Sequence, residues 1–412
     1  MVDMEKRLKR ENRSTKDSRA QISIFLSPEP WDGLPTNKHQ LARKLNEQEE
    51  VVYVDLNGAM PLDLLRGRKK FLTRATADAP AILVVPRLPV RLTRRYHFLL
   101  YGSMVLANIV IAAYLRCTHR SPNRVFLYFP PVVNGLFWRT ADTQVLYHCV
   151  DQFQSFPEWS VNIKPGLDED EKRTLLLSDV VVATSPALAA QCRQMRPDAH
   201  YLGNVADVEV FSLACENGPI DTRIAGLESP VLVFHGNLVG HKIDLKLLVN
   251  VQRRLTAGTV VVVGPVSDSE AEREIAELVV CGGFWIPSTP QRDLVPILRG
   301  ASFLLLPYIL TGHTANVFPL KLMEYLATGK PIVSTRLPAI VEQAGSVVHF
   351  VDSAEGVIQY CESPAPVQRY DAASDRQALA VGNDWSDRLR SLVELLDAAR
   401  NRKKAQASQG SL

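Results

Sequence analysis

Lys321, Glu324 and Thr328 have the residue types and the spacing to do chemistry together. Residues three and four apart share one stripe of an α-helix. Pro319 suits the start of that helix, and Gly329 suits its left-handed end. Free N–H groups and the dipole at a helix N-terminus attract phosphate, so the lysine could bind phosphate and the carboxylate sugar hydroxyls. The segment predicts a nucleotide-sugar diphosphate site, although a surface helix with a solvated Lys/Glu pair also fits the spacing.

Along the sequence, short apolar runs alternate with helical stretches, and these are the elements that must position this helix. Such alternation predicts parallel sheets covered by helices on both faces. Candidate strands of the first half are 22–27, 51–54, 81–85, 124–128, 145–150 and 180–184. Those of the second half are 231–235, 259–263, 283–286, 303–306, 332–335 and 347–351. We expect an α/β protein of two Rossmann-like doubly wound domains facing across a cleft, with ligands beyond the carboxyl ends of the strands.

Changes in composition divide the chain into five parts. At 412 residues the chain is too long for one hydrophobic core and suits two domains of ordinary size. We predict a basic disordered tail over 1–20, a first Rossmann-like domain over 21–205 and a second over 206–382. A helix over 383–400 is expected to pack back toward the first domain, followed by a disordered tail over 401–412.

Charge and cysteine content argue against several classes of protein. A net charge of +3 is too small to indicate nucleic-acid binding. The six cysteines are scattered without metal-ligand spacing, which argues against a zinc site or a disulfide framework and predicts a cytoplasmic location. No apolar stretch of a signal peptide follows the basic start. The basic tails could contact an anionic membrane surface, peripherally on the inner face of the plasma membrane, or could be solvated without a role.

The segment 98–115 is apolar enough to require a membrane test. Its length is near the lower limit for a membrane span. Glycine, serine and asparagine interrupt it, so we expect a buried or membrane-leaning helix of a globular domain. An interfacial contact is left open by the arginines that precede it, which are Arg91, Arg94 and Arg95.

Two loops of the first half carry candidate acceptor and catalytic residues. Trp31 could lie against a sugar or a lipid-linked acceptor, with Asp32 beside it, and Gly33 permits close approach of the backbone. A Pro/Gly turn with a half-buried tryptophan fits equally well. The strand 145–150 ends at Asp151, whose carboxylate could deprotonate an acceptor hydroxyl. A turn or N-cap role also fits this aspartate.

Loops of the second half supply candidate donor-binding groups. Gly236, followed by Asn237, allows the backbone after a strand to approach a pyrophosphate, which Lys242 could reach. Gly264 repeats the strand-then-glycine arrangement at the next strand.

A further loop leads directly into the helix of Lys321. It starts at Tyr308 and contains Thr314 and Asn316, and its backbone N–H groups could bind phosphate. The acidic triplet Asp168–Asp170 imitates a metal-binding motif, but it opens a helical stretch where acids simply favour the dipole. We therefore expect no metal site.

These motifs, taken in order, resemble those of the GT-B glycosyltransferases, specifically the large group similar to family 4 (group 1). The last motif is the most specific. The resemblance implies a nucleotide-sugar site on the C-terminal domain, an acceptor site on the N-terminal domain, and catalysis without a bound metal or other cofactor. Together with Trp385 the matching stretches cover most of 22–396, and they are Ser178–Leu188, Asn204–Phe211, Gly236–Leu238 and Pro319–Thr335.

The chain departs from the family pattern at two positions. That pattern has two glutamates separated by seven residues, of which Glu324 matches the second, implied to contact the nucleotide ribose. Asn316 replaces the first, and Asn237 replaces an arginine. Lys242 falls near the family's lysine, one residue out of register. The departures leave a retaining or inverting mechanism open and bring the chain closer to exopolysaccharide-type relatives, and Asp151 sits where an inverting enzyme would place its base.

The combined expectation is a glycosyltransferase moving a sugar from a nucleotide donor, expected to be UDP-linked, to a hydroxyl of a lipid-linked or polysaccharide acceptor. Lys321, the helix N-terminus and the amides of Thr314 to Asn316 would stabilise the leaving phosphate. A nucleotide-sugar epimerase of GT-B architecture is one alternative. A non-catalytic GT-B module of a polysaccharide assembly complex is another. A Rossmann dehydrogenase is disfavoured, because no Gly-x-Gly-x-x-Gly follows the first strand.

Overall fold

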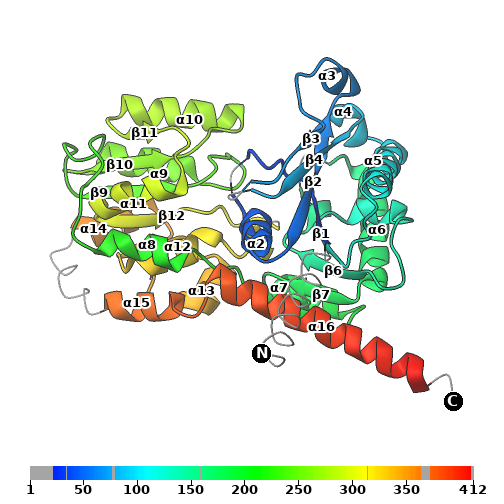
Figure 1. The fold of residues 1–412 in the computed structure, drawn as a ribbon. Helices are drawn as coiled ribbons and strands as arrows, with labels where there is room; N and C mark the ends of the chain where they lie inside the picture. The colour runs from blue at the N-terminus through cyan, green and yellow to red at the C-terminus, as the bar shows by residue number, and fades with distance from the viewer. Residues whose placement is uncertain are drawn as a thin grey trace, which may run out of the picture. The chain divides into compact units, whose positions relative to one another are not determined.

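The computed structural model describes residues 22–33, 35–76, 79–156, 159–312, 314–362 and 372–409. They form two compact units: unit 1 runs to Leu202 and resumes at Arg388, and unit 2 spans Gly203–Asp387. Each unit holds one sheet of mainly parallel strands with helices against it (Figure 1). This confirms the predicted doubly wound α/β class. The N-terminal tail, 1–20, lies outside the described residues.

The sheet of unit 1 has the order β3-β4-β2-β1-β5-β6-β7-β8, parallel except for the antiparallel β3–β4 pair. Its inner strands are buried on both faces, so they appear in the sequence as continuous apolar runs. Strands β3 and β8 have two residues each, which is too short for a sequence pattern. The bounds are β1 Ile22–Ser27, β2 Glu50–Ala59, β3 Leu72–Thr73, β4 Ala81–Pro86, β5 Arg124–Leu127, β6 Gln144–Cys149, β7 Val180–Ala183 and β8 His200–Tyr201.

The helices of unit 1 include α5, the one helix among the described residues that is long and apolar enough to cross a membrane. One face of α5 packs in the core through Leu100, Met104 and Ile111. Its buried Asn108 accepts a hydrogen bond from Trp138 Nε1 at 2.7 Å. Helix α5 is therefore a core helix with one exposed face. The helices are α2 Asn37–Asn46, α3 Pro61–Leu65, α4 Val90–Thr93, α5 His97–Cys117, α6 Lys164–Leu177, α7 Pro186–Arg193 and α16 Trp385–Gln409, with 3-10 turns η1 Pro130–Gly135, η2 Phe153–Ser155 and η3 Val161–Ile163.

The C-terminal helix α16 belongs to unit 1 from Arg388 onward. The backbone oxygen of Leu396 accepts a hydrogen bond from Gln144 Nε2, and Lys403 forms an ion pair with Asp179. The expectation of a disordered tail from residue 401 is therefore wrong over 401–409, which remain helical. The lysine, alanine and glutamine residues there are good helix formers, and the ion pair holds the helix against the sheet.

The sheet of unit 2 has the order β11-β10-β9-β12-β13-β14 and is parallel throughout. The strand order reverses between β9 and β12, which marks the switch point where doubly wound sheets bind ligands. The strands are β9 Val231–His235, β10 Thr259–Val263, β11 Phe284–Ile286, β12 Phe303–Leu306, β13 Ile332–Ser334 and β14 His349–Phe350. The helices are α8 Val208–Ser212, α9 Leu245–Arg254, α10 Ser269–Val280, α11 Gln291–Gly300, α12 Leu320–Thr328, α13 Pro338–Ala344, α14 Ala354–Glu362 and α15 Ala372–Ala380, with η4 Leu213–Cys215 and η5 Thr314–Asn316.

Candidate functional site

The carboxyl ends of β9 and β12 bring the predicted donor-binding segments of unit 2 together. His235 is the last residue of β9, Tyr308 lies two residues beyond β12, and α12 follows the next loop. Pro319 stands at the N-cap of α12, and Gly329 ends the helix with a φ of 66°. The prediction of this helix from its Pro and Gly boundaries is confirmed to within one residue.

Lys321 and Glu324 lie side by side near the start of α12. Lys321 Nζ is 3.1 Å from Glu324 Oε2, and the same oxygen is 3.3 Å from Nε2 of His235. Thr328 is fully buried at the far end of the helix, where its hydroxyl donates to the backbone oxygen of Tyr325. The expectation that its hydroxyl joins the site is wrong, because this side chain turns inward to close the helix.

The imidazole of His235 is neutral. Burial, together with the charge of Lys321, holds its pKa well below the usual value. Its contact with Glu324 is therefore no ion pair, and Nε2 has no hydrogen-bond partner among the described residues. The backbone N–H of His235 donates to Tyr325 Oη at 3.0 Å, which ties β9 to α12. The sequence analysis assigned no function to His235 or Tyr325, although a histidine between a strand and a glycine was an available signal.

Two glycines shape the loops beside Lys321. A Cβ on Gly264, whose φ is 145°, would lie 1.8 Å from the backbone oxygen of Gly236. A Cβ on Gly236 would lie 3.4 Å from Cε of Lys321. The loop after β9 thus lies in van der Waals range of the lysine, and its φ of 153° at Gly236 favours a residue without a side chain. Asn237 is exposed, and its Oδ1 accepts a hydrogen bond from Ser267.

The loop before α12 closes on itself. The N–H of Thr314 donates to Thr311 Oγ1 at 3.1 Å, and the N–H of Ala315 donates to the Thr311 oxygen at 3.0 Å. The phosphate contacts expected from these two amides are therefore not available in this conformation, because the turn uses them. Asn316 lies on the same turn, with its Nδ2 donating to the Gly312 oxygen at 3.0 Å. The first N–H groups of α12 remain, since a helix cannot bond them internally.

Tyr308 and Lys242 come from neighbouring loops of the same crevice. The N–H of Ile309 donates to the backbone oxygen of Lys242 at 2.9 Å, which joins the two loops. Burial, with a smaller effect of the charge on Glu324, raises the pKa of Tyr308. Its phenol therefore stays protonated and can donate a hydrogen bond.

The predicted acceptor loop of unit 1 follows β1. The ring of Trp31 packs against His39 and Tyr53, with centroids 5.5 and 5.0 Å apart. Asp32 and Gly33 are exposed beside it. The half-buried tryptophan in a turn is therefore the observed local structure. An acceptor role for Trp31, Asp32 and Gly33 stays a prediction.

An ion pair between a buried lysine and a partly exposed glutamate, which the sequence analysis did not predict, lies at this loop. Lys38, in the first turn of α2, places Nζ 2.8 Å from Glu29 Oε1. Burial alone would raise the pKa of Glu29, but the charge and hydrogen bond of Lys38 lower it. His39 Nε2 lies 3.1 Å from Tyr53 Oη, and burial lowers its pKa to about 4. These contacts hold the loop at the carboxyl edge of the sheet.

Asp151 lies two residues beyond the end of β6, half-buried at the carboxyl edge of the first sheet. The turn η2 that follows is anchored to α6, because Gln154 Nε2 donates a hydrogen bond to Glu171 Oε2 at 2.9 Å. The other oxygen of Glu171 accepts from Tyr147 Oη at 3.0 Å, and burial raises the pKa of this carboxyl. Asp151 thus sits on an anchored loop, and its role as a base stays a prediction.

Comparison with known proteins assigns a chemistry to this arrangement. Residues 229–362, which include Gly236, Lys321 and Glu324, match the family described as glycosyl transferases group 1. The chain is a glycosyltransferase. The predicted resemblance is thereby confirmed. A putative teichuronic acid biosynthesis glycosyltransferase of Bacillus subtilis is 24% identical over 279 residues, which are 64% of this chain and 68% of that relative.

Solved structures of similar fold cover nearly the whole glycosyltransferase. HepE of Anabaena in complex with UDP and glucose is 14% identical, with a TM-score of 0.63 over 92% of this chain and 100% of that one. Trehalose-6-phosphate synthase from Burkholderia multivorans is 13% identical, with a TM-score of 0.66 over 95% and 100%. These likenesses confirm the predicted GT-B fold class.

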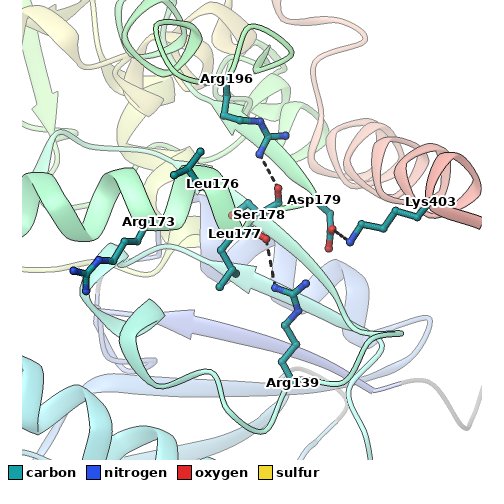
Figure 2. Close-up of a pocket in the computed structure, with 8 residues that line it drawn as sticks. All are labelled: Arg139, Arg173, Leu176, Leu177, Ser178, Asp179, Arg196 and Lys403. Atoms are coloured by element: carbon teal, nitrogen blue, oxygen red, sulfur yellow. Dashed lines mark hydrogen bonds and ion pairs between the residues drawn. The ribbon is translucent and has the colours of Figure 1, made fainter. Parts of the chain in front are cut away.

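Unit 1 of the glycosyltransferase also has a hollow of about 770 Å³ at the amino end of β7 (Figure 2). The loops of Trp31 and Asp151 lie at the opposite, carboxyl edge of the same sheet. Arg196 donates to the backbone oxygen of Ser178 at 2.7 Å, and Lys403 pairs with Asp179. The cations of this hollow thus hold α6 and α16 in place. The hollow is lined by Arg139, Arg173, Leu176, Leu177, Ser178, Asp179, Arg196 and Lys403.

The acidic triplet Asp168–Asp170 lies inside α6, which begins earlier than expected, at Lys164. Asp170 is buried and lies 2.8 Å from His97 Nε2, with Asn134 donating to its other oxygen. Across the described part of the chain, no group of three or more His, Cys, Asp or Glu side chains is placed to hold a metal ion. Within the triplet, Asp170 contributes to packing, and Asp168 and Glu169 are exposed.

Proposed function

We propose that this glycosyltransferase moves a sugar from a UDP-linked donor to a hydroxyl of a lipid-linked or polysaccharide acceptor, without a metal or other cofactor. Its place is cytoplasmic, peripheral on the inner face of the plasma membrane, in the synthesis of a cell-surface polysaccharide. The observation that carries the proposal is the convergence of Lys321, Glu324 and His235 at the switch point of unit 2. The relative in teichuronic acid biosynthesis and the UDP complex of HepE support it.

The donor half of the mechanism rests on charge compensation. As the glycosidic bond breaks, negative charge grows on the leaving diphosphate. Lys321 Nζ and the first N–H groups of α12 would stabilise that charge. Glu324 would accept hydrogen bonds from ribose hydroxyls. Because His235 is neutral, the positive charge of Lys321 and the negative charge of Glu324 cancel in the free enzyme. The diphosphate of the donor would then be a second anion in contact with Lys321.

The acceptor half uses the carboxyl edge of unit 1. Trp31 would contact a sugar or a lipid-linked acceptor through the exposed part of its ring. Asp151 would take the proton of the attacking hydroxyl in an inverting reaction. In a retaining reaction no strong base is required, and Asp151 would position the acceptor.

A panel of UDP-, GDP- and dTDP-sugars tests the donor assignment. We expect UDP and UDP-sugars to raise the thermal midpoint, because a ligand bound to the folded state stabilises it. We expect transfer to require an acceptor and to survive a metal chelator. An altered sugar formed without any acceptor would indicate an epimerase, and binding without turnover would indicate a non-catalytic assembly module.

Asp151→Asn is expected to lower transfer by about 10²–10⁴-fold with donor affinity unchanged, since the amide cannot accept the acceptor's proton. Product anomer analysis should then show inversion. Asp142→Asn, at an exposed aspartate before β6, is the matched control and should retain full activity. A fully active Asp151→Asn enzyme would exclude this residue as the base.

A further inference from the structure

Two segments of unit 1 leave the same edge of its sheet. Residues 60–76 follow β2 and include α3 and β3, and residues 88–101 follow β4 and include α4 and the first turn of α5. Strands β2 and β4 are parallel neighbours, so the chain emerges from both at their common carboxyl end. Figure 1 draws both α3 and α4 beyond this end of the sheet, in blue. We call the exposed side chains of these segments the apolar–basic surface.

Large apolar side chains project from this surface. Leu65 is 84% exposed and Phe98 is 68% exposed. Single exposed apolar residues are ordinary, but a group on neighbouring loops marks an interaction site. The exposed members include Leu62, Leu65, Phe71, Leu92, Phe98 and Tyr101.

The same segments carry an excess of positive charge. Residues 60–76 contain five lysines and arginines against one acid, and residues 88–101 contain three arginines and no acid. Among the described residues, the one ion pair made by these cations joins Arg68 to Asp63 at 3.5 Å. The surface therefore has unneutralised charge between its apolar tips.

We propose that the apolar–basic surface docks on an anionic lipid bilayer. Its apolar tips would enter the headgroup boundary while its cations reach lipid phosphates. Each cation near an anionic membrane strengthens binding roughly fivefold. The two segments carry eight cations against one acid, and this unbalanced charge fits a continuous anionic lipid surface.

The inference rests on the proposed function, because a membrane at this edge would present a lipid-linked acceptor. The loops of Trp31 and Asp151 follow β1 and β6, which end at the same carboxyl edge of the sheet. A membrane-bound acceptor would therefore meet the acceptor loops without leaving the bilayer surface.

Vesicle co-sedimentation of the full chain tests the surface. Vesicles of phosphatidylcholine alone are compared with vesicles containing about one third phosphatidylglycerol. We expect about tenfold or stronger partitioning onto the anionic vesicles, weakened as salt rises from about 0.1 to 0.5 M. The double variant Leu65→Ser/Phe98→Ser and the double variant Lys70→Glu/Arg94→Glu should each lower that partitioning about tenfold or more.

Matched controls lie on unit 2, where Val280→Ser replaces an 87% exposed valine and Lys246→Glu replaces an exposed lysine. Both should bind vesicles as the wild type does. Equal binding by the surface variants would overturn the proposal and place the contact elsewhere, for example in the basic residues before 21. The proposal would also be overturned if the wild-type chain did not bind anionic vesicles. UDP stabilisation, measured on the same samples, reports the proposed function separately, since none of these variants touches the donor site.

Discussion

Lys321→Met is expected to lower kcat/KM for the nucleotide-sugar donor by about 10²–10³-fold, the range seen when one group that stabilises a transition-state oxyanion is removed. Methionine keeps much of the length of the lysine stem and removes its charge. Since Lys321 Nζ lies 3.1 Å from Glu324 Oε2, the variant also leaves that carboxylate facing the neutral His235. We therefore expect weaker UDP binding as well as slower transfer. Steady-state kinetics with calorimetric UDP titration measures both.

The matched control is Lys246→Met, at an exposed lysine of α9 whose Nζ lies 3.5 Å from Glu270. It removes one charge and one ion pair from the same unit but should keep wild-type kinetics, since exposed pairs contribute little. A thermal midpoint close to wild type for Lys321→Met shows that folding is intact. Activity within about threefold of wild type would contradict the assignment of the leaving-group charge to this lysine.

Gly264→Ala is expected to destabilise unit 2 by about 2–4 kcal/mol and to impair donor binding. The new Cβ would lie 1.8 Å from the oxygen of Gly236 and 2.9 Å from its carbonyl carbon, and these backbone atoms cannot rotate away. The φ of 145° adds strain for any L side chain. Relief requires the ends of β9 and β10 to separate, which moves the loop that approaches Lys321. Urea unfolding and UDP titration measure the two effects.

Gly226→Ala is the matched control, because a Cβ there meets nothing within 4 Å and its backbone lies outside the left-handed region. This change should alter stability by less than about 0.5 kcal/mol. If Gly264→Ala matched the control in both stability and UDP affinity, the close approach of the two loops would not matter for the site.

Much of the fold could be predicted because buried parallel strands differ in sequence from their surroundings. Strands β1, β9, β10 and β12 have the bounds that their apolar runs predict. The missed strands β3 and β8 have two residues each, and they depend on a neighbour to pair with. The extension of α16 beyond residue 400 was missed for a similar reason. Its last turns are stabilised by Lys403 and Asp179, which are far apart in sequence.

In the candidate site too, local features could be predicted from the sequence, and features that depend on packing could not. The pairing of Lys321 with Glu324 follows from helical spacing, which is a local property. The approach of His235 from β9 and the hydrogen bond of its backbone to Tyr325 need the packing of α12 against the sheet. The pair of buried Lys38 with partly exposed Glu29 likewise joins α2 to the loop after β1. Lysine is rarely buried, so no composition rule would place it there.

By itself, the sequence determined the class of fold, the helix between Pro319 and Gly329 and the stripe that carries Lys321 and Glu324. These features depend on periodicity and on residues that start or end a helix, and both act within a few positions of the chain. Tertiary structure decided that His235 is neutral, that Thr328 faces inward and that the amide of Thr314 is already bonded. Those outcomes depend on burial and on hydrogen-bond partners, which come into being only when distant segments pack together.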